Sequence, residues 1–385
     1  MISRRSLLKA AAVTTVGIPA ATLGIKVTRA SAAGLTLSIV NNTGRYPNTA
    51  IWAYIVGTNL STGEQAYVRA DGTLTAVSAS LNGADGFADL GIPLATSGTT
   101  GLALPQMSGR VYFSIQNKLK FKVVTDGAGR AALQYPAGWV ASDPSYSVLH
   151  DCIEFTLNDA GMFCNTTNVD MLSIPMAITL DGAASQTTGT MRPGGRTAVF
   201  STLAALPDFT RLVIDDLRVI APGHGLDSGL FAATYFASYV DQVWAKYAGT
   251  DLTVQTDSRI VTGRVSGDVL AFTGDVASIR KPTTRDVLYC DGALAAPNDG
   301  ITGPVAAVLG AGFNRSTLLD STTQPVTNPA GFYQNPITNH YSRVIHENTV
   351  DGKAYGFAFD DVCSLASYVQ DSAPRSITVT LTPFD

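Results

Sequence analysis

The chain lacks the short motifs that identify several large classes of enzyme. It contains no G-x-S-x-G nucleophile turn, no phosphate-binding P-loop and no H-E-x-x-H zinc motif. A Ser-His-Asp triad stays open in principle, but nothing marks one serine as activated. The chain has only four histidines and four cysteines, and no two cysteines stand in C-x-x-C spacing. Ligands scattered in this way argue against a metal, so the sequence predicts chemistry without a metal or other cofactor.

The first 32 residues have the pattern of an export signal. The twin-arginine stretch SRRSLLK, residues 3–9, precedes an apolar run from Ala10 to Ile25, and Ala30-Ser31-Ala32 offers a cleavage site. A short membrane anchor is the alternative, but about 15 apolar residues fall short of the ~20 that span a bilayer. We expect a bacterial protein that is secreted by the twin-arginine route after removal of residues 1–32.

Charged residues are scarce, at 15% of the chain. The basic residues of the expected signal are Arg4, Arg5, Lys9, Lys26 and Arg29. Without these five, 21 of the 26 basic residues remain against 30 acidic ones, which gives the mature chain a net charge of −9. An acidic chain with few basic clusters is a poor candidate for binding nucleic acid or an anionic membrane. We therefore expect a neutral partner, and without a coiled-coil heptad we expect a monomer.

The cysteines are expected to pair once the protein is exported. An even number of cysteines in an oxidising compartment predicts one or two disulfides, and three full pairings are possible. The four residues are Cys152, Cys164, Cys290 and Cys363.

The pattern of apolar residues divides the mature chain into a β-rich and a mixed part. Residues 33–190 alternate short β-like runs such as LTLSIVNN and RVYFSIQ with turn residues, which predicts a β-barrel or β-sandwich. Residues 191–354 read as a mixed α/β domain, whose clearest helix is expected from about Ser228 to Tyr247. Residues 355–385 return to strand-like alternation, and we expect them to rejoin the β-rich domain.

Two isolated acids, Glu154 and Asp170, stand in the stretch IEFTLNDAGMFCNTTNVDMLSIP. Its first part predicts a hairpin around the turn NDAG. If Leu157 pairs with Met162, Glu154 faces Asn165 on a polar face. A straight strand would carry Asp170 ~16 Å beyond Asn165, whereas acid–base work on a glycosidic bond needs carboxyl groups ~5 to 9.5 Å apart. The chain must therefore bend between Thr166 and Val169, or Asp170 must come from a neighbouring strand.

The polar face of this hairpin could bind hydroxyl-rich ligands. We expect hydrogen bonds from Thr156, Asn158, Asn165 and Thr167, and stacking from Phe163, although we assign Phe163 to the apolar face with Ile153, Phe155 and Leu157. Among the aromatic residues elsewhere, Tyr135 and Trp139 lie in a loop and are candidates for binding, whereas Trp244 is expected in the core. Of the neighbouring acids Asp360 and Asp361, we expect at least one to be solvated. We expect one polar helix face to carry His340, Arg343 and His346. Two acids on turn-rich segments can equally be solvated surface.

The pattern EFT…G.F.N.T.VD…IP resembles glycoside hydrolase family 64, the bacterial endo-β-1,3-glucanases of the laminaripentaose-producing type within the thaumatin-like superfamily. DVLYCDGAL with GFNRSTLL, and HYSRVIHE with DGKAYGFAFDDVCS, are similar to further motifs of that family in the same order. The resemblance implies a mainly β fold with α/β, in which a thaumatin-like β-barrel or sandwich domain and a mixed α/β domain enclose a wide groove.

The resemblance also implies a function and a site. It implies inverting hydrolysis of β-1,3-glucan, such as laminarin, curdlan or fungal cell-wall glucan, with Glu154 as general acid and Asp170 as general base. Cys164 departs from the aliphatic residue expected in the motif, and with Cys152 close by it raises a possible disulfide near the site. A non-catalytic β-glucan-binding protein on the same scaffold and a secreted β-protein without a sugar partner are the alternatives.

Overall fold

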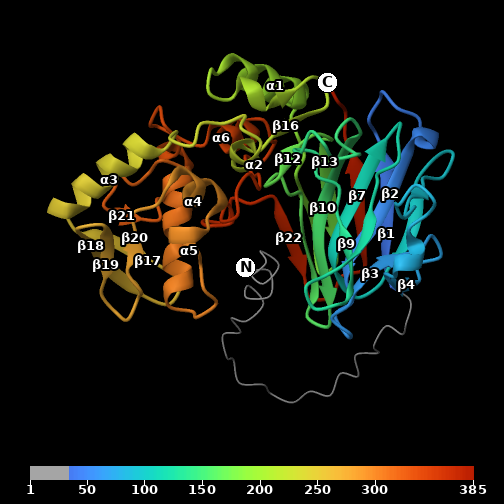
Figure 1. The fold of residues 1–385 in the computed structure, drawn as a ribbon, viewed down its shortest axis with the longest axis horizontal. Coiled ribbons are helices and arrows are strands. Elements are labelled where there is room, and N and C mark those ends of the chain that lie inside the picture. Colours follow the sequence, from blue (N-terminus) through green and yellow to red (C-terminus); the bar gives the residue numbers. More distant parts are fainter. Residues whose placement is uncertain (1–33) are drawn as a thin grey trace.

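The computed structural model describes residues 34–385 of the chain (Figure 1). The predicted export signal, residues 1–32, lies outside the described residues. The described part is mainly β with some helices. None of the helices among these residues is long and apolar enough to cross a membrane.

Two large sheets form the β-rich part of the molecule (right of Figure 1). The first has the strand order β14-β13-β23-β1-β6. Its strands are β1 (Leu35–Asn41), β6 (Thr100–Leu104), β13 (Met176–Asp181), β14 (Ser185–Thr188) and β23 (Ser376–Leu381). The second has the order β22-β11-β10-β7-β2-β3-β4, with β5 beside β2. Its strands are β2 (Ile51–Thr58), β3 (Gln65–Val68), β4 (Leu74–Ala76), β5 (Ile92–Pro93), β7 (Met107–Ile115), β10 (Leu149–Asn158), β11 (Gly161–Asn165) and β22 (Tyr368–Asp371).

The two sheets share one apolar core. Alternate residues of β23 (Ile377, Val379 and Leu381) and of β10 (Ile153 and Phe155) are almost fully buried in the same cluster. This period of two is what a strand with one covered face requires. Neither strand order returns to its first member, so the described sheets form no closed barrel.

The C-terminal strands lie in both sheets. β23 runs parallel to β1 and antiparallel to β13, and β22 forms the edge next to β11. A segment from the far end of the chain therefore pairs directly with the hairpin that carries Glu154, because β11 is the second arm of that hairpin.

The remaining elements belong mostly to the helical part (left and top of Figure 1). The helices are α1 (Gly195–Ala205), α2 (Pro222–Asp227), α3 (Ala237–Gly249), α4 (Thr284–Tyr289), α5 (Thr302–Asn314) and α6 (His340–Glu347). The small sheets are built from β12 (Met171–Leu172), β15 (Val213–Ile214) and β16 (Arg218–Ile220), and from β17 (Leu252–Gln255), β18 (Ile260–Ser266), β19 (Val269–Phe272), β20 (Ile279–Arg280) and β21 (Thr323–Gln324). A separate hairpin of β8 (Lys122–Thr125) and β9 (Ala131–Gln134) lies against the second sheet.

The helix expected from Ser228 to Tyr247 is shorter than predicted. α2 ends at Asp227, Gly229 takes a positive φ of 69°, and the amides of Leu230 and Phe231 both bond to the carbonyl of Gly225. Such a turn ends a helix, and α3 begins only at Ala237. Phe231 and Phe236 are nonetheless buried in the core, so the helical spacing of the apolar residues came from packing and not from one continuous helix. Trp244 lies in this core, as predicted.

The predicted disulfides are not formed: none of the four cysteines is in a disulfide. Cys152 lies on β10 and Cys164 on β11, and Cys152 is paired with Tyr112 of β7 whereas Cys164 is paired with Phe155 of β10. Residues 152 and 155 lie an odd number of positions apart on one strand, so the two thiols point to opposite faces of the sheet.

A buried ionic cluster joins α5, α6 and the segment that follows α6. Asp360 is fully buried and accepts hydrogen bonds from Arg315 (3.0 Å), Ser342 (3.0 Å) and His346 Nε2 (3.0 Å). His346 Nδ1 lies 2.7 Å from the carbonyl oxygen of Gly352. Both ring nitrogens thus face acceptors, which requires a proton on each. Burial alone lowers the pKa of His346, but the charge of Asp360 and the two hydrogen bonds raise it above its usual value.

The raised pKa of His346 predicts a decrease in stability with increasing pH. A folded-state pKa above the unfolded value of about 6.5 gives stability that is complete below that value and is lost as pH rises through the folded pKa. Urea unfolding at a series of pH values from about 6 to 9 measures this loss. We expect His346→Gln to make this loss smaller than in the wild type, and His340→Gln to leave it unchanged, while the buried Asp151, whose pKa burial raises to about 7, contributes to the loss in all three proteins. An equally steep loss in the His346→Gln protein would contradict the assignment.

Candidate functional site

The hairpin that carries Glu154 has the register expected from the sequence. Leu157 lies opposite Met162, and Glu154 lies opposite Asn165. On the other side of β10, Glu154 is paired with Arg110 of β7. Glu154 is therefore held between two inner strands of the second sheet, on the face that does not enter the shared core, and its side chain is 22% exposed.

The chain bends after β11 and brings Asp170 back to this sheet. Residues 166–170 form no strand. The amide of Asn168 bonds to the carbonyl of Tyr355 (2.8 Å), and the hydroxyl of Tyr341 in α6 donates to the carbonyl of Asn168 (2.7 Å). The bend is thus fixed by the C-terminal part of the chain, and the side chain of Asp170 is left 16% exposed.

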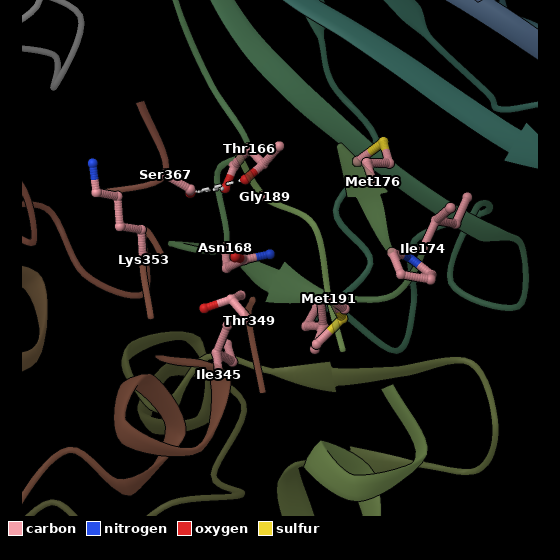
Figure 2. A pocket seen from close by; sticks show the side chains of 12 residues that line it. Thr166, Asn168, Ile174, Met176, Gly189, Met191, Ile345, Thr349, Lys353 and Ser367 are labelled. Carbon is pink, nitrogen blue, oxygen red and sulfur yellow. Dashed lines mark hydrogen bonds between the residues drawn. The ribbon is translucent and has the colours of Figure 1, made fainter. Parts of the chain in front are cut away.

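A small cavity of about 20 Å³ lies beside this bend. Figure 2 shows Thr166 and Ser367 joined by a hydrogen bond (2.8 Å) on one side, with Ile345 and Thr349 below Asn168. A volume of this size holds about one water molecule. The bend therefore packs closely against α6 and the segment after it.

Asp151 joins the two segments that carry the acids. Its carboxylate accepts the backbone N–H of Cys152 (2.9 Å) and those of Ser173 (2.7 Å) and Ile174 (3.1 Å). Asp151 lies three residues before Glu154, and Ser173 lies three residues after Asp170. These hydrogen bonds are buried, where a lost partner costs ~1–3 kcal/mol, so the relative position of the two segments is strongly fixed.

Arg110 bridges the two acids. Its Nε and Nη2 donate to Oε1 of Glu154 at 3.0 and 2.8 Å, and its Nη1 donates to Oδ2 of Asp170 at 3.0 Å. The same Nη1 lies 3.1 Å from the hydroxyl oxygen of Tyr112. Arginine suits this position because its planar fork offers several donors and stays charged. One guanidinium therefore fixes both carboxylates.

The bridge limits the distance between the acids. Nη1 and Nη2 share one carbon and are ~2.3 Å apart, so the bonded oxygens of Glu154 and Asp170 are at most about 8 Å apart. Carboxyl pairs that cleave a glycosidic bond are separated by ~5–5.5 Å in retaining and ~6.5–9.5 Å in inverting enzymes. The limit places both acids within reach of one such bond.

His224 is the second side-chain partner of Asp170. Its Nε2 lies 2.8 Å from Oδ1 of Asp170. The imidazole ring stacks on Trp139, with ring centroids 4.0 Å apart and 16° between the planes. His224 comes from α2, whose first turn is tied to the site by a hydrogen bond from the amide of Ala221 to the carbonyl of Asp170.

A buried arginine secures the loop that carries Trp139. Arg218 of β16 is fully buried and donates to the carbonyls of Gly138 (2.7 Å) and Tyr146 (2.6 Å). The predicted loop candidate Trp139 therefore reaches the acids through His224. Tyr135, the other loop candidate, packs instead against Tyr112 and Phe121.

The predicted binding residues lie in different environments. Thr156 is buried and shares a hydrogen bond with Ser108 (2.8 Å). Asn165 and Thr167 are also buried, at 1% and 4% exposure. Asn158 accepts the amide of Ala160 and so stabilises the hairpin turn. The structure brings Thr156 and Asn165 next to Glu154 on the sheet, whereas Asn158 lies at the far end of the strand.

The face assigned to Phe163 from the sequence was wrong. Phe163 lies opposite Thr156 and two residues from Asn165, so it belongs to the face of Glu154. It is half-buried and takes no part in the core formed by Ile153 and Phe155. An aromatic ring on this face can offer a flat surface to a sugar ring.

Sequence reasoning missed Arg110 and His224. Arg110 stands in the run RVYFSIQ, which was recognised as a strand. It is the one cation of that run, and this isolated charge could have marked it as a site residue. No local signal marked His224.

The other predicted charged residues lie elsewhere: Asp360 is buried in the ionic cluster, and His340, Arg343 and His346 line a separate cavity of about 640 Å³ beside α6. Within residues 34–385, no group of three or more His, Cys, Asp or Glu side chains is arranged to hold a metal ion.

Comparison with known proteins identifies the family. The model of glycoside hydrolase family 64, described as β-1,3-glucanase, matches residues 33–381. The glucan endo-1,3-β-glucosidases of Cellulosimicrobium cellulans and of Arthrobacter sp. (strain YCWD3) are each 37% identical over 302 residues, which cover 74% of this chain and 54% of each relative. The chain thus spans about half the length of the curated relatives it matches.

Solved structures agree with this result. A laminaripentaose-producing β-1,3-glucanase in complex with laminaritetraose is 39% identical, with a TM-score of 0.84 over 92% of this chain and 99% of that one. A β-1,3-glucanase domain from Clostridium beijerinckii is 27% identical, with a TM-score of 0.81 over 90% of this chain and 98% of that one. The chain therefore belongs to glycoside hydrolase family 64, the β-1,3-glucanase family.

Proposed function

We propose that this protein is an endo-acting, inverting hydrolase of β-1,3-glucan, with Glu154 as general acid and Asp170 as general base. The observation that supports this most directly is the pair of half-buried carboxylates bridged by Arg110. The relatives named as glucan endo-1,3-β-glucosidases and the similar structure that holds laminaritetraose support the substrate class. A glucan is uncharged, which suits an acidic chain with few basic clusters.

The two oxygens of Glu154 differ in a way that suits a proton donor. Arg110 donates twice to Oε1, while Oε2 receives no hydrogen bond from the described residues. Oε2 is therefore the oxygen that carries the proton to the leaving group. Asp170 binds Arg110 and His224 through different oxygens, so both oxygens are held in the site, and the carboxylate would take the proton of the attacking water.

We further propose that the fold is a thaumatin-like sandwich and that the site lies in a wide groove between this sandwich and the helical part. The strip of sheet with Glu154, Thr156 and the half-buried Phe163 would form one wall, and the Trp139 loop with α2 would form the other. Aromatic faces and amide or hydroxyl groups are the partners that sugar rings require. A groove open at both ends admits the interior of a polymer, as endo-cleavage demands.

Replacement of either acid is expected to abolish most turnover. Glu154→Gln and Asp170→Asn should each lower kcat on curdlan or laminarin by roughly 10²–10⁴-fold, the usual contribution of one general acid or base. A reducing-sugar assay measures the loss, and glucan binding and far-UV circular dichroism measured in parallel report an intact fold. Glu64→Gln and Asp159→Asn, which alter exposed acids, serve as matched controls. Wild-type protein that binds glucan without cleaving it would refute the enzyme assignment.

Inversion predicts the anomer of the first product. Attack of water on the face opposite the leaving group converts a β-linkage into an α-configured reducing end. Proton NMR during the first minutes of laminarin hydrolysis, before mutarotation, should therefore show the α-anomer first. Early appearance of the β-anomer would show retention and would rule out Asp170 as a base in a single displacement.

We also propose export by the twin-arginine route, with cleavage after Ala32. The pattern SRRSLLK, the apolar run and Ala30-Ser31-Ala32 support this. Expression of the complete chain in a bacterium with this pathway should give a secreted protein whose first residue is Ala33. Substitution of Lys for both Arg4 and Arg5 should retain the precursor inside the cell, and N-terminal sequencing of the secreted and cell fractions checks both results.

A further inference from the structure

His224 belongs to a chain of hydrogen bonds that leads away from Asp170. Nε2 faces Oδ1 of Asp170 at 2.8 Å, and Nδ1 lies 3.3 Å from the hydroxyl oxygen of Tyr289 in α4. That hydroxyl in turn lies 2.5 Å from Oδ2 of Asp227, the last residue of α2. The His224 side chain is 12% exposed, whereas the side chain of Asp227 is 44% exposed, so the hydrogen bonds run from the site toward solvent.

The direction of each bond follows from the donors and acceptors present. Asp227 forms an ion pair with Arg285, whose guanidinium also stacks on the ring of Tyr289. Burial raises the pKa of Asp227, but the hydrogen bonds from Arg285 and Tyr289 lower it below its usual value overall. Asp227 is thus a carboxylate and only accepts. The single proton of the Tyr289 hydroxyl is directed to Asp227, and its oxygen can then only accept from Nδ1 of His224.

The other ring nitrogen, Nε2, also faces a carboxylate oxygen. Oδ1 belongs to a carboxylate whose second oxygen already accepts from Arg110, so Nε2 must act as a donor. Which nitrogen of a histidine carries a proton is set by the partner of the other nitrogen. Here both partners are acceptors, and the ring must carry two protons.

We propose that His224 is a positioning residue that holds Asp170 ionised and correctly oriented, and that Tyr289 and Asp227 keep His224 doubly protonated for this purpose. This inference rests on the proposed role of Asp170 as general base. The charged and titratable groups around His224 come from four elements: Asp170 from the bend, Arg110 from β7, Tyr289 and Arg285 from α4, and Asp227 from α2. Trp139 covers the face of the ring. Loss of the Nε2 proton breaks the bond that orients Asp170, and loss of the Nδ1 proton breaks the bond to Tyr289.

Activity measurements can separate positioning from a purely structural role. His224→Ala removes the donor, and we expect kcat to fall roughly 10- to 100-fold, the value of one charge-assisted hydrogen bond, with little change in KM. His224→Gln retains an N–H donor that does not titrate. It should therefore restore much of kcat. His340→Gln is the matched control and should leave kcat unchanged.

Tyr289→Phe tests the hydrogen bonds that lie beyond His224, on the side away from Asp170. The substitution removes the acceptor of Nδ1 and keeps the aromatic ring. We expect a decrease in kcat smaller than that of His224→Ala, because Nε2 of His224 still faces Oδ1 of Asp170. Wild-type kcat in Tyr289→Phe, together with a His224→Gln protein no more active than His224→Ala, would overturn the proposal.

The protonation of the ring can be measured without any assay of activity. The chain has only four histidines, so ¹⁵N-histidine labelling of the complete protein gives few ring signals, and His224→Gln assigns that of His224. We expect both ring nitrogens protonated at neutral pH, and loss of a proton at lower pH in Tyr289→Phe. A neutral ring with one bare nitrogen at neutral pH would overturn the inference.

The two proposals fail in different ways. If Glu154→Gln and Asp170→Asn abolish hydrolysis while His224→Ala retains full kcat, the proposed function stands and the role of His224 is refuted. If the wild type does not hydrolyse β-1,3-glucan, the proposed function fails, and the hydrogen bonds from Asp170 to Asp227 then have no catalytic role. The NMR measurement still decides how many protons His224 carries.

Discussion

The guanidinium of Arg110 is the interaction on which the candidate site depends. It stands opposite Glu154 in the pairing of β7 with β10 and reaches Asp170 from the same position. Because this one guanidinium bonds both carboxylates, it fixes the separation of the acids, which is the quantity that hydrolysis of a glycosidic bond demands.

The rest of the fold serves to bring Asp170 to that guanidinium. Glu154 needs only its own sheet, but Asp170 needs the bend at residues 166–170, and the bend is fixed by Tyr341 and Tyr355 from the C-terminal third of the chain. α6, which carries Tyr341, is itself anchored through His346 to the buried Asp360. The site is therefore a product of both parts of the molecule, although both acids lie within sixteen residues of each other in the sequence.

Sequence reasoning succeeded where one local rule was sufficient. The hairpin of Glu154 was predicted with its register, because turn chemistry and alternation fix the pairing of neighbouring strands. It failed where two rules competed or distant segments decided. Phe163 was assigned to the wrong face because the apolar type of its side chain was given more weight than its parity with Asn165. The long helix before Tyr247 was predicted from apolar spacing, which tertiary packing can satisfy with a turn and a shorter helix.

The sequence by itself determined the mainly β character of the fold, the two acids and their motif, and the family, because these depend on residue types at short spacing. Only the tertiary structure decided that the cysteines stay apart and that Arg110 and His224 meet Asp170. The physical reason is that side-chain contacts between strands and helices distant in sequence depend on strand order and on the path of each bend. Arg110 and His224 are 114 positions apart along the chain, and no local pattern links them before the sheets and helices assemble.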